Sequence, residues 1–252
     1  MMKLIQVADL HFGRECKPAI TAAISAINSL QADALIVAGD LTQRGKTSEF
    51  EAARDWLSQI PLPQIVVPGN HDTPMLNLYA RAHEPFKRFC ELFGEDMQTL
   101  KFPGLKIVGL NTARGWQVRR NWAEGSVNLD DLQDALGDTP ELKALVCHHP
   151  FRPVPGAPLT TRTKRGARAS QAIARSNVRM LFTGHVHQPA IQNWREEGGQ
   201  YLAIGAGTLS DRLREWPPSF NEIQLNSGQV QVIAHAYEGT RFVPRKLGTF
   251  TL

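Results

Sequence analysis

The sequence predicts an α/β fold built on two β-sheets, and three features of the chain lead to this prediction. Residues 1–70 alternate short apolar runs with segments in which apolar residues recur at helical spacing, which is typical of parallel strands joined by helices. Residues 105–184 repeat this alternation. The chain after residue 190 consists of successive strand-like runs with little helix. We therefore expect two α/β halves whose sheets face each other, the second half closing with antiparallel strands.

The first half is expected to contain three buried strands and two helices. The strands are expected at residues 3–9, 33–39 and 63–69. Residues 18–30 carry isoleucines at helical spacing and predict the first helix. Residues 46–60 predict the second helix, with Ser48 and Glu51 placed as a capping box at its start.

The second half is expected to add seven strands and two further helices. Strands are expected at residues 105–111, 142–148, 178–184, 190–194, 200–207, 220–225 and 229–237, and helices at residues 129–136 and 165–176. The segment from Gly239 onward is compatible with a dimer arm or with packed coil. No composition shift marks a boundary, so we expect residues 1–252 to form a single domain.

Composition limits the classes of function. The net charge of +4 and the pI near 9.1 suit an anionic substrate but are too weak to predict nucleic-acid binding. No apolar run reaches the roughly 18–20 residues of a membrane span, and no signal peptide is evident at the N-terminus. Three widely spaced cysteines predict reduced thiols and a cytoplasmic location.

Metal-ligating side chains follow five of the predicted strands. They are Asp9 and His11, Asp40, Asn70 with His71 and Asp72, His148 with His149, and His185 with His187. Sites in α/β sheets form beyond the carboxyl ends of strands. Each motif taken alone is also compatible with a plain turn or a capped strand end. Five such motifs in one chain, each after a predicted strand, favour a shared site. Strand alternation would place His185 and His187 on one face, and would turn Cys147 away from the site into the core.

The donor types suit transition metals. Carboxylate, amide and imidazole donors without thiolates favour Mn²⁺, Fe or Zn²⁺ over Ca²⁺. The donors are too numerous for one tetrahedral ion, whereas two ions sharing a carboxylate could clamp a phosphoryl group.

The ordered motifs Asp9-x-His11, Gly39-Asp40, Gly69-Asn70-His71-Asp72, His148 and Gly184-His185-x-His187 resemble those of the calcineurin-like metallophosphoesterases. Together they are most similar to the bacterial class III cyclic-nucleotide phosphodiesterase branch. The resemblance implies a four-layer α/β/β/α sandwich with two facing mixed β-sheets.

The resemblance also implies a role for each residue of the site. It implies a first metal held by Asp9, His11 and His187, a second held by Asn70, His148 and His185, and a bridging Asp40. The ions would be Mn²⁺, Fe²⁺/Fe³⁺ or Zn²⁺, with a bridging hydroxide as the nucleophile. His71 would donate a hydrogen bond or proton to the substrate. Asp72 would orient His71 or cap the turn, and His149 would contact the substrate.

These features predict a metal-dependent phosphodiesterase acting on a nucleotide or cyclic nucleotide. A phosphomonoesterase or a pyrophosphatase could use the same core, although the lipid A pyrophosphatases typically have Arg where this chain has His71. A DNA exonuclease would usually be longer. A non-catalytic scaffold, like the retromer subunit with this fold, should have lost ligands, and none is missing here. We expect a small phosphate ester as partner rather than a nucleic acid, and a homodimer remains possible.

Two loops are candidates for substrate selection. Residues 113–125 combine Arg114, Arg119 and Arg120 with Trp116 and Trp122, a mixture suited to a nucleotide's phosphate and base. The alternatives are a plain surface loop or a dimer contact. The proline-rich loop at residues 151–168 follows His149 directly and is either substrate-lining or simply solvated.

Overall fold

The computed structural model describes residues 1–116, 121–157 and 162–252, and it places two six-stranded sheets face to face. The first sheet has the strand order β12-β11-β10-β1-β2-β3. Its strands are β1 (Met2–Val7), β2 (Ala34–Ala38), β3 (Gln64–Val67), β10 (Ser219–Asn226), β11 (Gln229–Tyr237) and β12 (Phe242–Thr251). The first three strands are parallel, and the last three add to them in antiparallel fashion.

The second sheet has the strand order β4-β5-β6-β7-β9-β8. Its strands are β4 (Thr99–Phe102), β5 (Leu105–Gly109), β6 (Lys143–Val146), β7 (Val178–Thr183), β8 (Ala190–Glu196) and β9 (Gly199–Gly205). Strands β5, β6, β7 and β9 run parallel to one another. The edge strands β4 and β8 pair in antiparallel fashion with β5 and β9.

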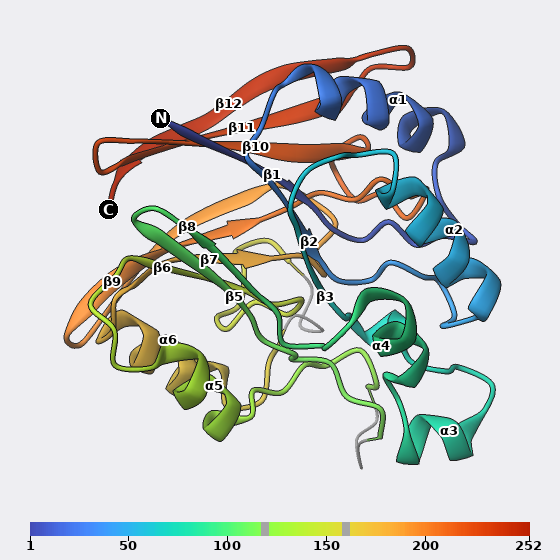
Figure 1. The fold of residues 1–252 in the computed structure, drawn as a ribbon, viewed down its shortest axis with the longest axis horizontal. Helices are drawn as coiled ribbons and strands as arrows, with labels where there is room; N and C mark the ends of the chain where they lie inside the picture. The colour runs from blue at the N-terminus through green and yellow to red at the C-terminus, as the bar shows by residue number, and fades with distance from the viewer. Residues whose placement is uncertain (117–120, 158–161) are drawn as a thin grey trace.

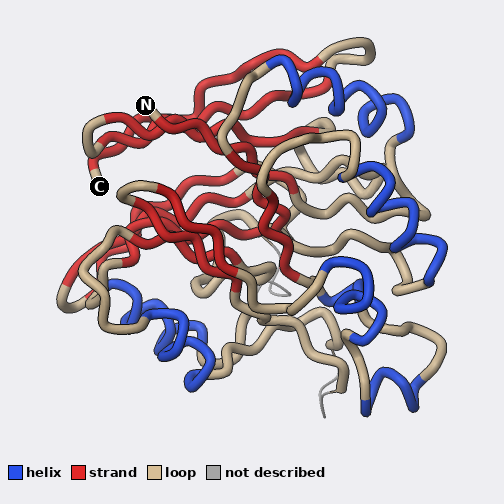
Figure 2. Tube along the Cα trace, viewed as in Figure 1, coloured by secondary structure: helices blue, strands red, loops and turns tan. Residues whose placement is uncertain are grey.

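Helices cover the outer face of each sheet (Figure 1). The helices are α1 (Lys17–Ser29), α2 (Thr47–Leu57), α3 (Leu78–His83), α4 (Lys87–Phe93), α5 (Leu129–Leu136) and α6 (Gly166–Ala174), with a short 3₁₀ turn at Asn70–Asp72. Figure 2 shows the strands of both sheets enclosed between the two sets of helices. The expected four-layer α/β/β/α sandwich is confirmed.

Strand alternation explains the three layers of core. Successive side chains of a strand point to opposite faces, so Leu4 enters the core between the sheets while Ile5 faces the first helix layer. That helix layer contributes Ile20 and Phe50 to the core. On the other side, apolar residues of α5 and α6 pack against the outer face of the second sheet. Cys147 is buried in this third cluster, as its expected orientation away from the site requires.

A buried polar contact joins the two sheets next to the site. Gln6 of β1 donates from Nε2 to the carbonyl oxygens of Thr183 and Ile204, each at 3.0 Å. Its Oε1 accepts from Asn221 Nδ2 at 3.1 Å. Because a buried amide without partners would be costly, this network fixes the end of β7 against β1.

Three local expectations are wrong. The start of α2 is not capped by Ser48 and Glu51: the carboxylate of Glu49 accepts from the main-chain nitrogens of Arg44 and Lys46, at 2.7 and 3.3 Å. The segment after Gly239 is neither an arm nor coil, because it forms the edge strand β12. Strands β10 to β12 return to the first sheet, so only β8 closes the second sheet after β7 and β9.

Candidate metal centre and active site

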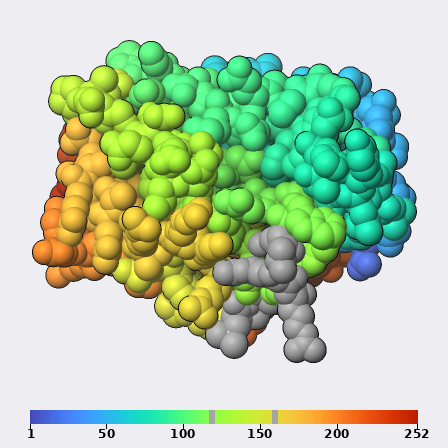
Figure 3. Space-filling model, turned by 90° about the horizontal axis from the view of Figure 1, so that it is seen from below, coloured from blue at the N-terminus to red at the C-terminus, as the bar shows by residue number. Residues whose placement is uncertain are grey.

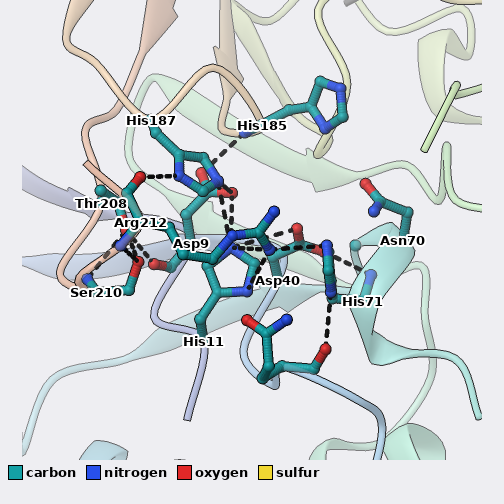
Figure 4. A network of polar contacts seen from close by, with 12 residues as sticks. Asp9, His11, Asp40, Asn70, His71, His185, His187, Thr208, Ser210 and Arg212 are labelled. Carbon is teal, nitrogen blue, oxygen red and sulfur yellow. Dashed lines mark hydrogen bonds and ion pairs between the residues drawn. The ribbon is translucent and has the colours of Figure 1, made fainter. Parts of the chain in front are cut away.

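The carboxyl ends of five strands converge on one site. Strands β1, β2 and β3 of the first sheet and β6 and β7 of the second are each followed directly by candidate ligands. Figure 4 shows Asp9, His11, Asp40, His71 and His187 gathered from separate loops, with the ring of His185 turned away from this group. The prediction that strand ends would bring these residues together is therefore confirmed in space.

The main chain at the ligands is unusual. Five of the eight non-glycine residues with positive φ among the described residues are candidate ligands: Asp9, His11, Asp40, His185 and His187. Their φ angles lie between 46° and 71°. Such left-handed conformations cost energy in non-glycine residues and concentrate at functional sites. The strand-alternation argument for His185 and His187 is wrong, because β7 ends at Thr183 and both residues lie in this strained turn.

Asp9, His11 and His187 form the first group of donors. They are all buried, and one donor atom from each lies within 4.8 Å of the others. His187 Nε2 lies 3.1 Å from Asp9 Oδ1 and 3.2 Å from His11 Nε2. Three donors that face one another this closely can hold one cation.

Asp40 lies between this group and a second one. Its Oδ2 is 3.3 Å from His148 Nε2 and 3.7 Å from His11 Nε2. Asp9, Asp40 and His148 form one set of mutually close donors, and His148, His149 and His185 form another. The two carboxylates thus lie where the donor groups meet.

Main-chain carbonyls orient two of the histidines. His148 Nδ1 donates to the carbonyl oxygen of Ala38 at 2.8 Å, and His187 Nδ1 donates to that of Arg212 at 2.6 Å. In each ring, Nε2 is left to face the centre. A metal-ligating histidine is typically held through its other nitrogen in this manner.

The buried charges fit a cation. Asp9 Oδ1 and His148 Nε2 are buried and make no hydrogen bond, although each lies close to another donor. Burial raises the pKa of Asp40, but the neighbouring His148 and His71 outweigh it and hold that pKa well below its usual range. Burial lowers the pKa of His11 to about 3, so this ring is neutral and able to coordinate. Burial and the charge of Asp40 raise the pKa of Asp72 to about 7. A bound cation would relieve the repulsion between these carboxylates.

Asp72 ties together the two loops that carry Asp40 and Asn70. Its buried carboxylate accepts from the main-chain nitrogens of Gly69 at 2.8 Å and Leu41 at 3.2 Å. It also accepts from the main-chain nitrogen and the hydroxyl of Thr42, both at 2.9 Å. It makes no contact with the His71 ring among these bonds, so its role here is to hold the turn.

His71 is held as one tautomer. Its main-chain nitrogen donates to Asp40 Oδ1 at 2.8 Å, and its Nδ1 donates to the carbonyl oxygen of Gln43 at 2.7 Å. Nε2 therefore faces the site, 2.8 Å from Nη1 of Arg212. A ring nitrogen of His71 also lies within 4.8 Å of donor atoms of His11 and Asp40. The geometry therefore fits either a substrate contact or metal ligation by His71.

His149 is buried, like His148 in the same group. Its ring is buried, and its Nδ1 is 3.0 Å from the hydroxyl of Thr112. Its Nε2 is 3.1 Å from the carbonyl oxygen of Ala123 and 3.2 Å from Asn70 Oδ1. This environment favours a role in orienting Asn70, while the contact with substrate stays a prediction.

Comparison with known proteins agrees with this geometry. A family model described as calcineurin-like phosphoesterase matches residues 2–189. The chain belongs to this family. A probable cyclic nucleotide phosphodiesterase of Synechococcus is 27% identical over 205 residues, which cover 76% of this chain and 75% of that protein. The glycerophosphodiester phosphodiesterase GpdQ of Enterobacter lignolyticus is 28% identical over 69% of this chain and 63% of its own.

A solved structure supports the fold independently. A dimetal phosphatase from Danio rerio superposes with a TM-score of 0.67 at 14% identity, covering 98% of this chain and 99% of that one. Members of the calcineurin-like phosphoesterase family hydrolyse phosphoric esters and bind two metal ions, and the His and Asp clusters found here are of that kind. Within the described residues, no helix has the length and apolar character that a membrane crossing needs.

The sequence analysis missed the segment of this phosphoesterase that follows β9. Thr208 donates from its hydroxyl to the carbonyl oxygen of Asp9 at 2.6 Å, and Ser210 contacts Thr208 at 2.6 Å. Arg212 then reaches the histidines of the site. The available signal was a sixth strand end, at residues 200–207, followed by polar side chains.

The loop at residues 113–125 is only partly described. Arg119 and Arg120 lie outside the described residues. Trp116 is 51% exposed, and its ring packs edge-on against Trp122 at 5.2 Å between centroids. The guanidinium of Arg81 lies 4.6 Å from the centre of the Trp122 ring. Trp116 thus presents an open aromatic face while Trp122 is fixed beneath it.

Proposed function

We propose that this protein is a dinuclear metal-dependent phosphodiesterase that acts on a nucleotide-sized substrate such as a cyclic nucleotide. The observation that carries the proposal is the convergence of two donor groups on the shared carboxylates Asp9 and Asp40. The names of the two sequence relatives, a probable cyclic nucleotide phosphodiesterase and a glycerophosphodiester phosphodiesterase, support diester chemistry.

The proposed ligand sets divide the donors by location. The first metal would be held by Asp9, His11 and His187, the second by Asn70, His148 and His185, and Asp40 would contact both. Mn²⁺, Fe²⁺/Fe³⁺ and Zn²⁺ all suit these oxygen and nitrogen donors. When bound, such ions polarise the phosphoryl oxygens and activate water for attack at phosphorus. The three free cysteines fit the reducing conditions of a cytoplasm.

The protein's own residues supply positioning and proton handling. His71 is held by Gln43 so that Nε2 faces the reacting group. In this tautomer Nε2 carries no proton, so it would take up a proton from solvent and then donate it to a phosphoryl oxygen or to the leaving oxygen. His149 keeps Asn70 oriented through the 3.2 Å contact with its Oδ1.

A basic cavity lined in part by the segment that contacts His149 supports an anionic substrate. It measures about 650 Å³, and its basic lining residues are Arg162, Lys164, Arg165 and Arg168. It also borders Glu124, the neighbour of Ala123, whose carbonyl accepts from His149. Figure 3 shows this region of the chain on one face of the molecule. A volume of this order could hold a nucleotide, so we infer that the cavity receives the part of the substrate beyond the scissile phosphate.

A substrate panel tests the proposal. The Mn²⁺-loaded protein should hydrolyse bis(p-nitrophenyl) phosphate and one or more of the 3′,5′-cyclic nucleotides, 2′,3′-cyclic nucleotides or linear dinucleotides. Diesters should react faster than p-nitrophenyl phosphate. A higher rate on monoesters would instead favour a phosphomonoesterase. Two bound metals with no hydrolysis of any phosphate ester would favour a binding scaffold.

A further inference from the structure

Arg212 places a cation directly over the donor groups. Its Nη1 lies 2.8 Å from His71 Nε2 and 3.5 Å from both ring nitrogens of His11 (Figure 4). The residue is half-buried and comes from the loop after β9, about two hundred positions along the chain from His11. The guanidinium therefore faces the part of the site where a substrate would meet His71.

The loop that carries Arg212 is anchored to the loop after β1. The main-chain nitrogen of Cys16 donates to the carbonyl of Leu209 at 3.0 Å, and that of Asp211 donates to the carbonyl of Arg14 at 3.0 Å. Ser210 Oγ accepts from the main-chain nitrogen of Arg212 at 3.2 Å. These bonds fix the main chain from which the Arg212 side chain extends, so its location over the site follows from the fold.

The Arg212 guanidinium has no acidic partner in the part of the chain that the structure describes. The adjacent carboxylate of Asp211 is turned away and pairs with Nε of Arg14 at 3.1 Å. Arg212 contacts only imidazole nitrogens. Bound metals would add positive charge next to this guanidinium, so an anion that joins it would be favoured.

We propose that Arg212 is a catalytic residue that binds the phosphoryl group of the substrate; this rests on the proposed phosphoesterase function of the same site. A guanidinium offers several N–H donors in one plane and pairs closely with the oxygens of a phosphoryl group. In the free protein, Nη1 donates to His71 Nε2. When substrate binds, a phosphoryl oxygen takes the place of Nε2 as the acceptor. The freed Nε2 can then take up a proton from solvent and donate it to the leaving oxygen.

The main chain and the side chain of Arg212 have separable roles. The carbonyl oxygen accepts from His187 Nδ1 at 2.6 Å and so orients a proposed metal ligand. Truncation of the side chain leaves this carbonyl in place. An Arg212→Ala variant should therefore retain its metals while losing affinity for phosphate.

The test compares Arg212→Ala and Arg212→Lys with the matched control Arg214→Ala. Arg214 lies on the same segment, is exposed, and makes no hydrogen bond or ion pair with any residue in the described ranges. Metal content is measured by elemental analysis, and the affinity of the Mn²⁺-loaded proteins for inorganic phosphate is measured by calorimetry. Steady-state kinetics with bis(p-nitrophenyl) phosphate are recorded with and without added guanidinium.

Arg212→Ala should keep the metal content of the wild type, bind phosphate at least about tenfold more weakly, and lose about 10²- to 10³-fold in kcat/KM, the range found when one transition-state donor is removed. Lys should restore part of this loss, added guanidinium should partly rescue the Ala variant, and Arg214→Ala should match the wild type. Unchanged phosphate affinity with full metal content would overturn the assignment, as would metal loss in the Ala variant. Phosphate binding that depends on Arg212 in a protein that hydrolyses no ester would support Arg212 as a phosphate-binding residue and refute the proposed function.

Discussion

Gly69→Ala should displace Asp40 and so disable the metal site without altering any ligand. Gly69 has a φ of −110°, which alanine adopts without strain, so the effect of the added methyl group is purely steric. A Cβ at this position would lie 2.1 Å from Asp40 Oδ1 and 2.4 Å from the main-chain nitrogen of Asp40. Contacts this close do not occur, since real Cβ atoms keep at least 3.0 Å from such neighbours.

The size of the effect follows from these distances. Asp40 and Gly69 must separate by roughly 0.6 to 0.9 Å to reach a 3.0 Å contact. Forced overpacking of a buried site typically costs about 1–3 kcal/mol of unfolding free energy. A shift of about 1 Å in a catalytic group can cost about 10²-fold in rate. Because Asp40 faces both donor groups, we expect weaker binding of both metals and a rate lower by at least about 10²-fold.

The assay measures unfolding in urea, metal content and hydrolysis of bis(p-nitrophenyl) phosphate on the same preparations. The control is Gly104→Ala in the β4–β5 turn, where no atom lies within 4 Å of the added Cβ but φ is +79°. This control should lose about 1–2 kcal/mol through backbone strain and keep its metals and its rate. A Gly69→Ala protein with full metal content and wild-type rate would refute the claim that this glycine sets the position of Asp40.

The other predictions concern two carboxylates, one imidazole and one tryptophan. Asp40→Ala should lose metal and activity together, and a variant with two metals and a near-normal rate would exclude Asp40 as the shared ligand. His71→Ala should keep its metals by elemental analysis while kcat falls by about 10²- to 10⁴-fold, with a smaller loss on p-nitrophenyl esters; metal loss would make His71 a ligand. Although burial raises the pKa of Glu222, hydrogen bonds from Gln224 and His235 outweigh it and lower that pKa below its usual 4.5. The ionised carboxylate thus stabilises the fold above pH 4.5 and loses this effect as the pH falls through its lowered pKa, so Glu222→Gln should melt at a lower temperature at pH 7 and converge with the wild type in acid. Trp116→Ala should alter the relative kcat/KM values of different nucleotide substrates and leave bis(p-nitrophenyl) phosphate hydrolysis intact; an equal loss on both would assign Trp116 a structural role.

Much of the fold could be predicted because its signals are local. The isoleucine spacing that predicted a helix at residues 18–30 corresponds to α1, and the prediction at residues 129–136 matches α5. Sheet membership could not be read in this way. Strands β10 to β12 are alternating or apolar runs like any others, and their pairing with β1 depends on long-range packing.

The capping of α2 shows the same limit on a smaller scale. Ser48 and Glu51 have the spacing of a capping box, but the helix begins two residues earlier, with Lys46 as its N-cap, and Glu49 occupies the third position. Which of two nearby carboxylates caps a helix depends on where the preceding loop directs the chain. Here the loop that leaves Asp40 brings the nitrogens of Arg44 and Lys46 to Glu49.

The sequence by itself determined the chemistry of the site. Asp, Asn and His after five apolar strands imply oxygen and nitrogen donors at a common sheet edge, because strand ends collect there in any such fold. Only the tertiary structure decided which of these residues contact one another and where each lies in the site. It placed Asp40 between the two donor groups, turned His149 inward against Asn70, and brought Arg212 from the far end of the chain onto His71. Spacing along a chain reports which residues share a strand or a helix, whereas the contacts between separate loops depend on how the two sheets pack together.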